Sequence, residues 1–93
     1  MKMNSYAQEK LGLAADELVG PGPIKERLRR AARTLSAVSA KDFPPDLQPH
    51  FKKIHSALTR RRGKVEKTID AMTEEEASAV AKHIAMLQRT VGD

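Results

Sequence analysis

The sequence predicts an all-α fold: a compact antiparallel helical bundle of four main helices plus one short helix. Apolar residues recur throughout at the three- and four-residue spacing of an α-helix, and no stretch alternates with the period of two typical of a strand. Glycine and proline clusters divide the chain into segments of helical length. With 93 residues and no internal repeat, residues 1–93 are expected to form a single helical domain.

A first helix is expected over residues 5–19. Ser5 and Gln8 have the spacing of a capping box, in which the two side chains satisfy free backbone N–H groups of the first turn. The Gly-Pro-Gly-Pro sequence at residues 20–23 ends this helix, because proline cannot continue it. The predicted inward stripe is Ala7, Leu11, Ala14, Ala15 and Leu18.

A second helix is expected over residues 23–38, with Pro23 in its first turn, where a missing N–H is tolerated. Glu26 is predicted to pair with Arg30, four residues further along. The inward stripe is Ile24, Leu28, Ala31, Leu35 and Val38. The arginines that point away from this stripe are Arg29, Arg30 and Arg33.

Residues 46–62 are expected to form the central packing helix of the bundle. Asp46 is a good N-cap, and Pro49 falls within the permissive first turn. Gly63 is expected to end this helix, and Phe43, in the preceding link, is expected to tuck under the bundle. The apolar stripe is Leu47, Phe51, Ile54 and Leu58.

The last third of the chain predicts a short helix over residues 64–72 and a long one that extends to about Val91. Thr73 and Glu76 form a second capping box between them, and the acidic first turn of the last helix suits the positive end of its dipole. The short helix turns inward Val65, Ile69 and Met72. The stripe of the last helix is Ala77, Val80, Ala81, Ile84, Leu87 and Val91.

The formal net charge of +5 is distributed unevenly. Residues 41–67 carry eight Lys or Arg against three Asp or Glu, whereas residues 68–93 carry two against five. This asymmetry favours an anionic partner or pairing between two copies of the chain. The absence of cysteine excludes disulfides. No apolar run is long enough for a membrane span or a signal peptide, so a cytoplasmic location is expected.

The titratable residues do not predict a metal site or a catalytic site. His50 and His55 lie about 140° apart around a helix and cannot share one ion, and His83 belongs to a different helix. Serines and threonines occur mainly at caps and turns, and no carboxylate occupies a position that is expected to be buried. We therefore expect no metal, no cofactor and no catalytic residue, that is, a protein that is not an enzyme.

Two functions fit these observations. The first is a protein-interaction or self-associating helical module, which binds a protein partner or a second copy of the chain. The alternative is non-specific nucleic-acid binding through a basic surface. The first is favoured, because no aromatic residues are interleaved with the cations to stack on bases. The candidate contacts to an anion or partner are Arg29, Arg30, Arg33, Lys52, Lys53, Arg60, Arg61, Arg62, Lys64 and Lys67.

A motif in three parts extends over about residues 10–85. It reads Lys10-Leu11, Ala14 and Leu18-Val19-Gly20-x-Gly22-x-Ile24-Lys25-Glu26-Arg27-Leu28, then Asp42-Phe43-Pro44, then Ile69-Asp70-Ala71-Met72-Thr73-Glu74-Glu75-Glu76-Ala77. With these residues the chain resembles a group of small, uncharacterised bacterial helical proteins. The resemblance implies a bacterial cytoplasmic protein, and it carries over no activity, ligand or catalytic residue.

Overall fold

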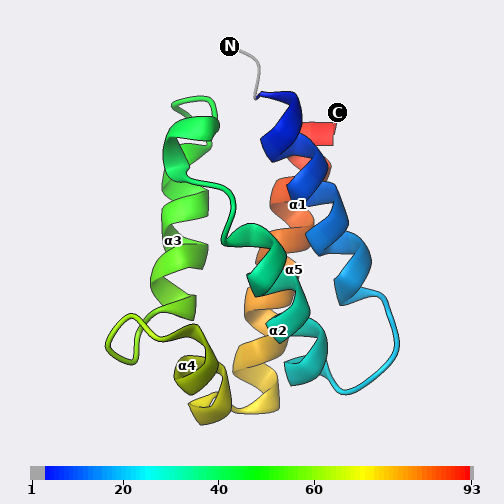
Figure 1. Cartoon of the computed structure of the whole chain (residues 1–93), viewed down its shortest axis with the longest axis vertical. Coiled ribbons are helices and arrows are strands. Elements are labelled where there is room, and N and C mark those ends of the chain that lie inside the picture. The colour runs from blue at the N-terminus through cyan, green and yellow to red at the C-terminus, as the bar shows by residue number, and fades with distance from the viewer. Residues whose placement is uncertain (1–3, 93) are drawn as a thin grey trace.

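The computed structural model describes residues 4–92 and confirms the predicted all-α bundle (Figure 1). Four longer helices are joined by short links, and one short helix and a 3-10 helix lie within those links. No strand occurs within residues 4–92. The elements are α1 (Ser5–Leu18), α2 (Ile24–Leu35), η1 (Ala40–Asp42), α3 (Gln48–Leu58), α4 (Val65–Ala71) and α5 (Glu74–Gly92).

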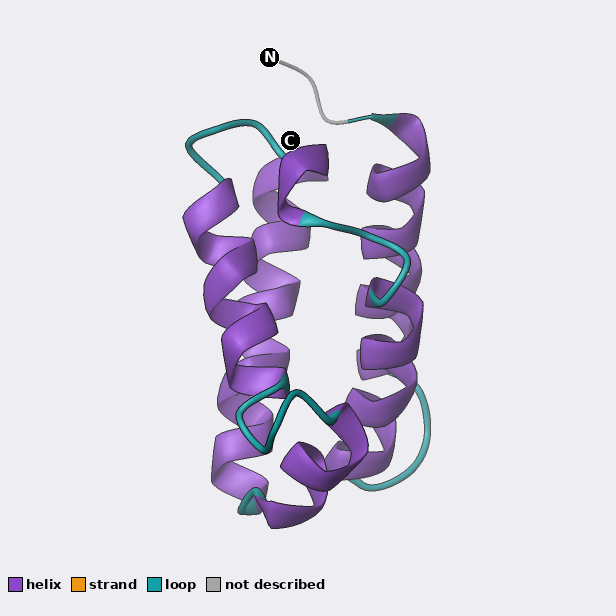
Figure 2. Cartoon of the chain, turned by 60° about the vertical axis from the view of Figure 1, so that its left-hand side comes forward, coloured by secondary structure: helices purple, strands orange, loops and turns teal. Residues whose placement is uncertain are grey.

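The four longer helices run alongside one another in alternating directions, as Figures 1 and 2 show. The chain descends along α1, ascends along α2, descends along α3 and, after α4, ascends along α5 (Figure 1). The start of α1 and the end of α5 therefore lie at one end of the bundle. The opposite end carries α4 and the turn that precedes it. None of the helices within residues 4–92 has the length and apolarity needed to cross a membrane.

The central packing helix is α5, and the prediction that residues 46–62 take this role is wrong. α5 packs against α1, α2 and α3, whereas α3 packs against α5, α4 and η1. The reason lies in the residues that α5 buries. Ala77 and Ala81 are small enough to let neighbouring helices approach closely, and Ile84 and Leu87 fill the space further along.

The core contains the apolar stripes predicted for the helices except Ala15, and two of its residues, Val38 and Phe43, come from links. Phe43 is only 3% exposed, and its ring stacks on that of Phe51, with 4.7 Å between the ring centroids. This confirms that Phe43 tucks under the bundle. The largest side chains with almost no exposed area are Leu11, Leu28, Ile54, Ile69 and Ile84.

The first two helices begin differently from the prediction. The N-cap of α1 is Asn4, whose side-chain oxygen accepts a hydrogen bond from the N–H of Ala7 at 2.8 Å, so Ser5 is already helical and does not cap. Pro23 is the N-cap of α2 and lies outside the first turn, with an extended backbone. α2 ends at Leu35, and Val38 is buried from the link that follows.

The predicted bounds of the third helix are too wide at both ends. Asp46 is not its N-cap, because a turn in which the N–H groups of Leu47 and Gln48 donate to the carbonyl of Pro44 occupies this position. Pro49 does lie in the first turn, as predicted. The helix ends at Leu58 and not at Gly63. The last residues of the predicted helix form a turn instead, which consists of Thr59, Arg60, Arg61, Arg62 and Gly63.

The predictions for the last two helices are confirmed. α4 covers residues 65–71 of the predicted 64–72. The capping box at the start of α5 is formed: the N–H of Thr73 donates to the Glu76 carboxylate at 2.9 Å, and the N–H of Glu76 donates to the Thr73 hydroxyl at 3.1 Å. The first of these bonds lowers the pKa of Glu76 below its usual value.

Candidate basic interface

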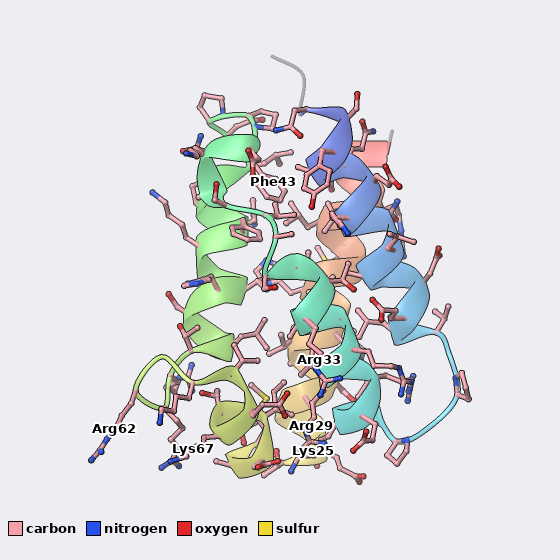
Figure 3. All side chains as sticks on the ribbon, in the orientation of Figure 1. Lys25, Arg29, Arg33, Phe43, Arg62 and Lys67 are labelled. Atoms are coloured by element: carbon pink, nitrogen blue, oxygen red, sulfur yellow. The ribbon has the colours of Figure 1, made fainter. Side chains whose placement is uncertain are left out.

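The arginines on the outer face of α2 are engaged in contacts with the neighbouring α4 (Figure 3). Arg29, whose side chain is 18% exposed, forms ion pairs with Glu26 at 2.9 Å, with Glu66 at 3.3 Å and with Asp70. Arg33 also pairs with Glu66, at 3.3 Å. The predicted pair of Glu26 with Arg30 is therefore replaced by one with Arg29. The hydrogen bond to Asp70 raises the pKa of Arg29 above its usual value.

The other arginines of α2 hold the loop between α1 and α2. Arg30 donates a hydrogen bond to the carbonyl of Pro21 at 2.6 Å. Arg27 donates to the carbonyls of Gly22 at 2.9 Å and Leu18 at 2.8 Å, so it also satisfies a free carbonyl at the end of α1. The guanidinium groups on α2 thus have protein partners, which reduces their capacity to bind an external anion.

A second group of cations has no such partners. Its members lie on the turn after α3 and on the start of α4, all are exposed, and none forms an ion pair within residues 4–92. Figure 3 shows that Arg62 and Lys67 project away from the bundle at the end that carries α4. We call this group the basic end, and it consists of Arg60, Arg61, Arg62, Lys64 and Lys67.

Lys52 and Lys53, also predicted as partner contacts, are exposed on α3. Lys52 lines a shallow cavity beside η1, together with Val38 and Ser56. Lys53 lies three residues after His50, whose ring contacts that of His83 on α5, so Lys53 is on a neighbouring side of α3. Consecutive positions on a helix are about 100° apart, so the two lysines lie on different sides of α3.

The turn that carries the arginines is held by a buried threonine. Thr68 is 3% exposed, and its hydroxyl accepts a hydrogen bond from the N–H of Arg61 at 2.9 Å and donates one to the carbonyl of Lys64 at 2.8 Å. The N–H of Gly63 donates to the carbonyl of Thr59 at 2.9 Å. Thr68 was not among the predicted site residues. Its spacing of three residues after Val65 and four before Met72 places it on the predicted inward face of this helix, and this spacing is the signal that could have identified it.

A hollow of about 270 Å³ lies between the end of α3, α4 and the first half of α5. Arg60, Arg61 and Glu76 contribute polar groups to its lining. The charges of these two arginines add to the capping hydrogen bonds in lowering the pKa of Glu76. The remaining surface of the hollow is mainly apolar and includes Ala57, Ala71, Met72, Ala79 and Val80. The hollow therefore combines a mainly apolar floor with a basic rim.

The histidines form a pair that spacing along one helix does not reveal. His50 on α3 and His83 on α5 have ring centroids 5.8 Å apart with perpendicular rings, whereas His55 lies beside Phe51. Within the described part of the chain, no group of three or more His, Asp or Glu residues is arranged to hold a metal ion. Partial burial lowers the pKa of His83, and His50 and Lys53 lower it further.

Comparison of the chain with known protein families, with curated proteins and with solved structures finds no match in any of the three. The basic end is distinguished from the arginines of α2 because its cations are close in sequence, exposed, and unpaired within residues 4–92.

Proposed function

We propose that the protein is a non-enzymatic interaction module, and that its basic end binds an acidic segment of a protein partner. The observation that carries this proposal is the contrast between two sets of arginines. Those on α2 are paired with carboxylates or backbone carbonyls, whereas Arg60, Arg61 and Arg62 have no ion-pair partner within residues 4–92. Guanidinium groups pair with carboxylates through two parallel hydrogen bonds, which suits recognition of Asp or Glu.

The order of the turn supports the proposal. We call residues 59–63 the arginine turn. Its backbone is held by the hydrogen bonds of the Thr68 hydroxyl and by the bond between Gly63 and Thr59. A partner therefore has to immobilise only the arginine side chains, and less conformational entropy is lost when the complex forms. An unstructured basic tail, by contrast, loses that entropy on binding.

Two features favour a protein over a nucleic acid as the partner. The exposed Glu74 and Glu75 begin α5 at the same end of the bundle, so a phosphate backbone that crosses this end would meet carboxylates. Lys52 and Lys53 are consecutive on α3 and lie about 100° apart around it, so the two do not form one row of cations. Non-specific nucleic-acid binding, the alternative predicted from the sequence, depends on an extended track of cations.

The proposal is tested with a fluorescein-labelled amphipathic peptide of about 20 residues, with Leu on one face and Glu on the other, and with a duplex DNA of similar length. Fluorescence anisotropy at about 0.15 M salt reports binding of each. The double variant Arg60→Glu with Arg62→Glu is expected to bind the peptide at least about tenfold more weakly than the unmodified chain. Circular dichroism is expected to show little change in helicity, because both residues lie outside the helices.

The matched control is Lys10→Glu with Lys41→Glu. It changes the net charge by the same amount but on α1 and η1, away from the basic end and from α5. The control is expected to retain the peptide affinity within about twofold. Equal losses in both double variants would show that net charge alone drives binding and would overturn the proposal. Tighter binding of the duplex, with a steep loss between about 50 and 200 mM salt, would favour the nucleic-acid alternative.

A further inference from the structure

The outer face of α5 exposes a large apolar side chain, with one small and two charged side chains on the same face. Met86 is 62% exposed. Glu75, Ala79 and Lys82 are exposed at spacings of three and four residues before it, so the four side chains lie on one face of the helix. A single exposed methionine is common on protein surfaces and requires no explanation by itself.

The same face also borders the hollow between α3, α4 and α5. Ala79 contributes to its wall, and Ala57 and Ala71 contribute from the other two helices. Met86 is seven residues after Ala79, which is two turns and about 10 Å along the helix axis. The molecule thus carries an apolar projection and a hollow lined by apolar and polar side chains in about equal parts, at a fixed separation on one side of α5.

We propose that this face binds a second copy of the chain. The two α5 helices pack antiparallel around a two-fold axis, and Met86 of each copy enters the hollow of the other. A two-fold interface uses the same patch on both subunits, so it requires a patch that is complementary to itself. The thioether side chain is unbranched and adapts to an irregular cavity, and the small Ala79 lets the two helices approach closely.

The charges on this face suit the antiparallel arrangement. If Met86 lies opposite Ala79 of the other copy, Glu75 lies opposite Thr90, next to Arg89 of that copy. Each dimer would then contain two Glu75–Arg89 pairs, related by the symmetry axis. Lys82 is the charged side chain of this face nearest the axis, and repulsion between the two copies of it opposes association. We therefore expect a weak dimer with a Kd in the range of about 10–100 µM.

Sedimentation equilibrium from about 10 µM to about 1 mM protein at about 0.15 M salt tests the proposal without an additional partner. The expected result is a monomer–dimer equilibrium that Met86→Glu shifts at least about tenfold toward monomer. The matched control is Leu13→Glu on α1. Leu13 is 44% exposed, so this variant also replaces an exposed apolar side chain by a carboxylate. A monomer at every concentration, or equal effects of the two variants, would overturn the proposal.

A charge exchange tests the antiparallel register. Glu75→Arg and Arg89→Glu are each expected to weaken the dimer severalfold, because each places like charges opposite one another. The double variant Glu75→Arg with Arg89→Glu restores opposite charges in every pair and is expected to recover most of the lost affinity. If the double variant dimerises no more tightly than the weaker-binding of the two single variants, the antiparallel pairing is overturned. Both readouts are independent of the acidic peptide, so failure here leaves the proposed function intact.

Discussion

The hydroxyl of Thr68 accepts a hydrogen bond from the backbone N–H of Arg61 at a distance of 2.9 Å. The two residues are seven positions apart, and the bond joins the arginine turn to the buried face of α4. Because the same hydroxyl donates to the carbonyl of Lys64, one side chain satisfies two backbone groups of the turn. The position of the basic end relative to the bundle therefore depends on one buried side chain.

Thr68→Val is expected to lower the free energy of unfolding by about 1–3 kcal/mol. Valine has nearly the same shape but leaves the N–H of Arg61 and the carbonyl of Lys64 without their side-chain partner. The acidic peptide is expected to bind more weakly as well, since the turn is no longer held. Urea denaturation and peptide anisotropy measure the two effects.

Thr90→Val is the control for this prediction, because the Thr90 hydroxyl is exposed and donates only to the carbonyl of Met86. Its unfolding free energy is expected to change by no more than about 0.5 kcal/mol. If Thr68→Val changed the unfolding free energy as little as this control does, the turn would be held by its own backbone hydrogen bonds and not by the Thr68 hydroxyl.

Gly63→Ala is expected to destabilise the protein by about 1 kcal/mol, and Arg62→Gly is expected to stabilise it slightly. Both residues have left-handed backbone angles, with φ of 74° at Gly63 and 57° at Arg62. A Cβ at Gly63 would have no neighbour within 4 Å, so the cost arises from the backbone and not from a clash. Thermal denaturation of the two variants tests this, and a stabilised Gly63→Ala would contradict the assigned backbone conformation.

Arg29→Ala is expected to lower the unfolding free energy by about 1 kcal/mol, through loss of its ion pairs and of its packed aliphatic stem. Arg33→Ala is the matched control. Arg33 is 70% exposed and pairs only with Glu66, so its loss is expected to change the free energy by less than about 0.5 kcal/mol. The difference between the two variants should shrink at high salt, since screening weakens the pairs. Guanidinium chloride is itself a salt and would screen these pairs, so urea is the suitable denaturant.

Phe43→Ala is expected to cost about 3–5 kcal/mol, which is a large part of the stability of a domain of this size. Phe43 is almost fully buried and stacks on Phe51, so its removal leaves a cavity under the link between α2 and α3. Phe43→Leu refills most of that volume and should recover at least half of the loss. Near-equal stability of the two variants would mean that the link moves away without disturbing the core.

Stability is expected to fall as the pH drops below about 6.5, in part because of His83. In the folded chain, burial and the nearby His50 and Lys53 lower the pKa of His83 below its usual value of 6.5. Between the two pKa values the unfolded chain binds more protons than the folded chain, so protonation favours unfolding. His83→Gln should flatten the dependence of the unfolding free energy on pH, measured between pH 5 and 8. His55→Gln, a substitution of an exposed histidine outside the pair, is the control.

The inward faces of the helices were predictable because apolar spacing alone determines them. Leu28, Ile69 and Ile84 are fully buried, as their stripes predict. The capping box of Thr73 and Glu76 was predictable for a similar reason, since both of its hydrogen bonds are made within one turn. Local patterns of this kind do not depend on how the helices are arranged in space.

Features that depend on contacts between distant segments were not predictable. Arginine favours helices, so the sequence extends the third helix through Arg60–Arg62, whereas the structure ends it at Leu58 and bonds Arg61 to Thr68. From the sequence alone, the outer face of α2 is also predicted to be basic. Its charge is compensated by Glu66 and Asp70, about forty residues away, which the periodicity of α2 cannot reveal.

The positions of the start of α1 and the end of α5 have a practical consequence for measurements on this molecule. The first residue of α1 and the last turn of α5 lie on the side of the bundle remote from the arginine turn, in a molecule whose longest dimension is 36 Å (Figure 1). A chain tethered through either terminus to a sensor chip, a bead or a neighbouring domain would orient its guanidinium groups toward the solution. Fusion tags can therefore be attached without shielding them.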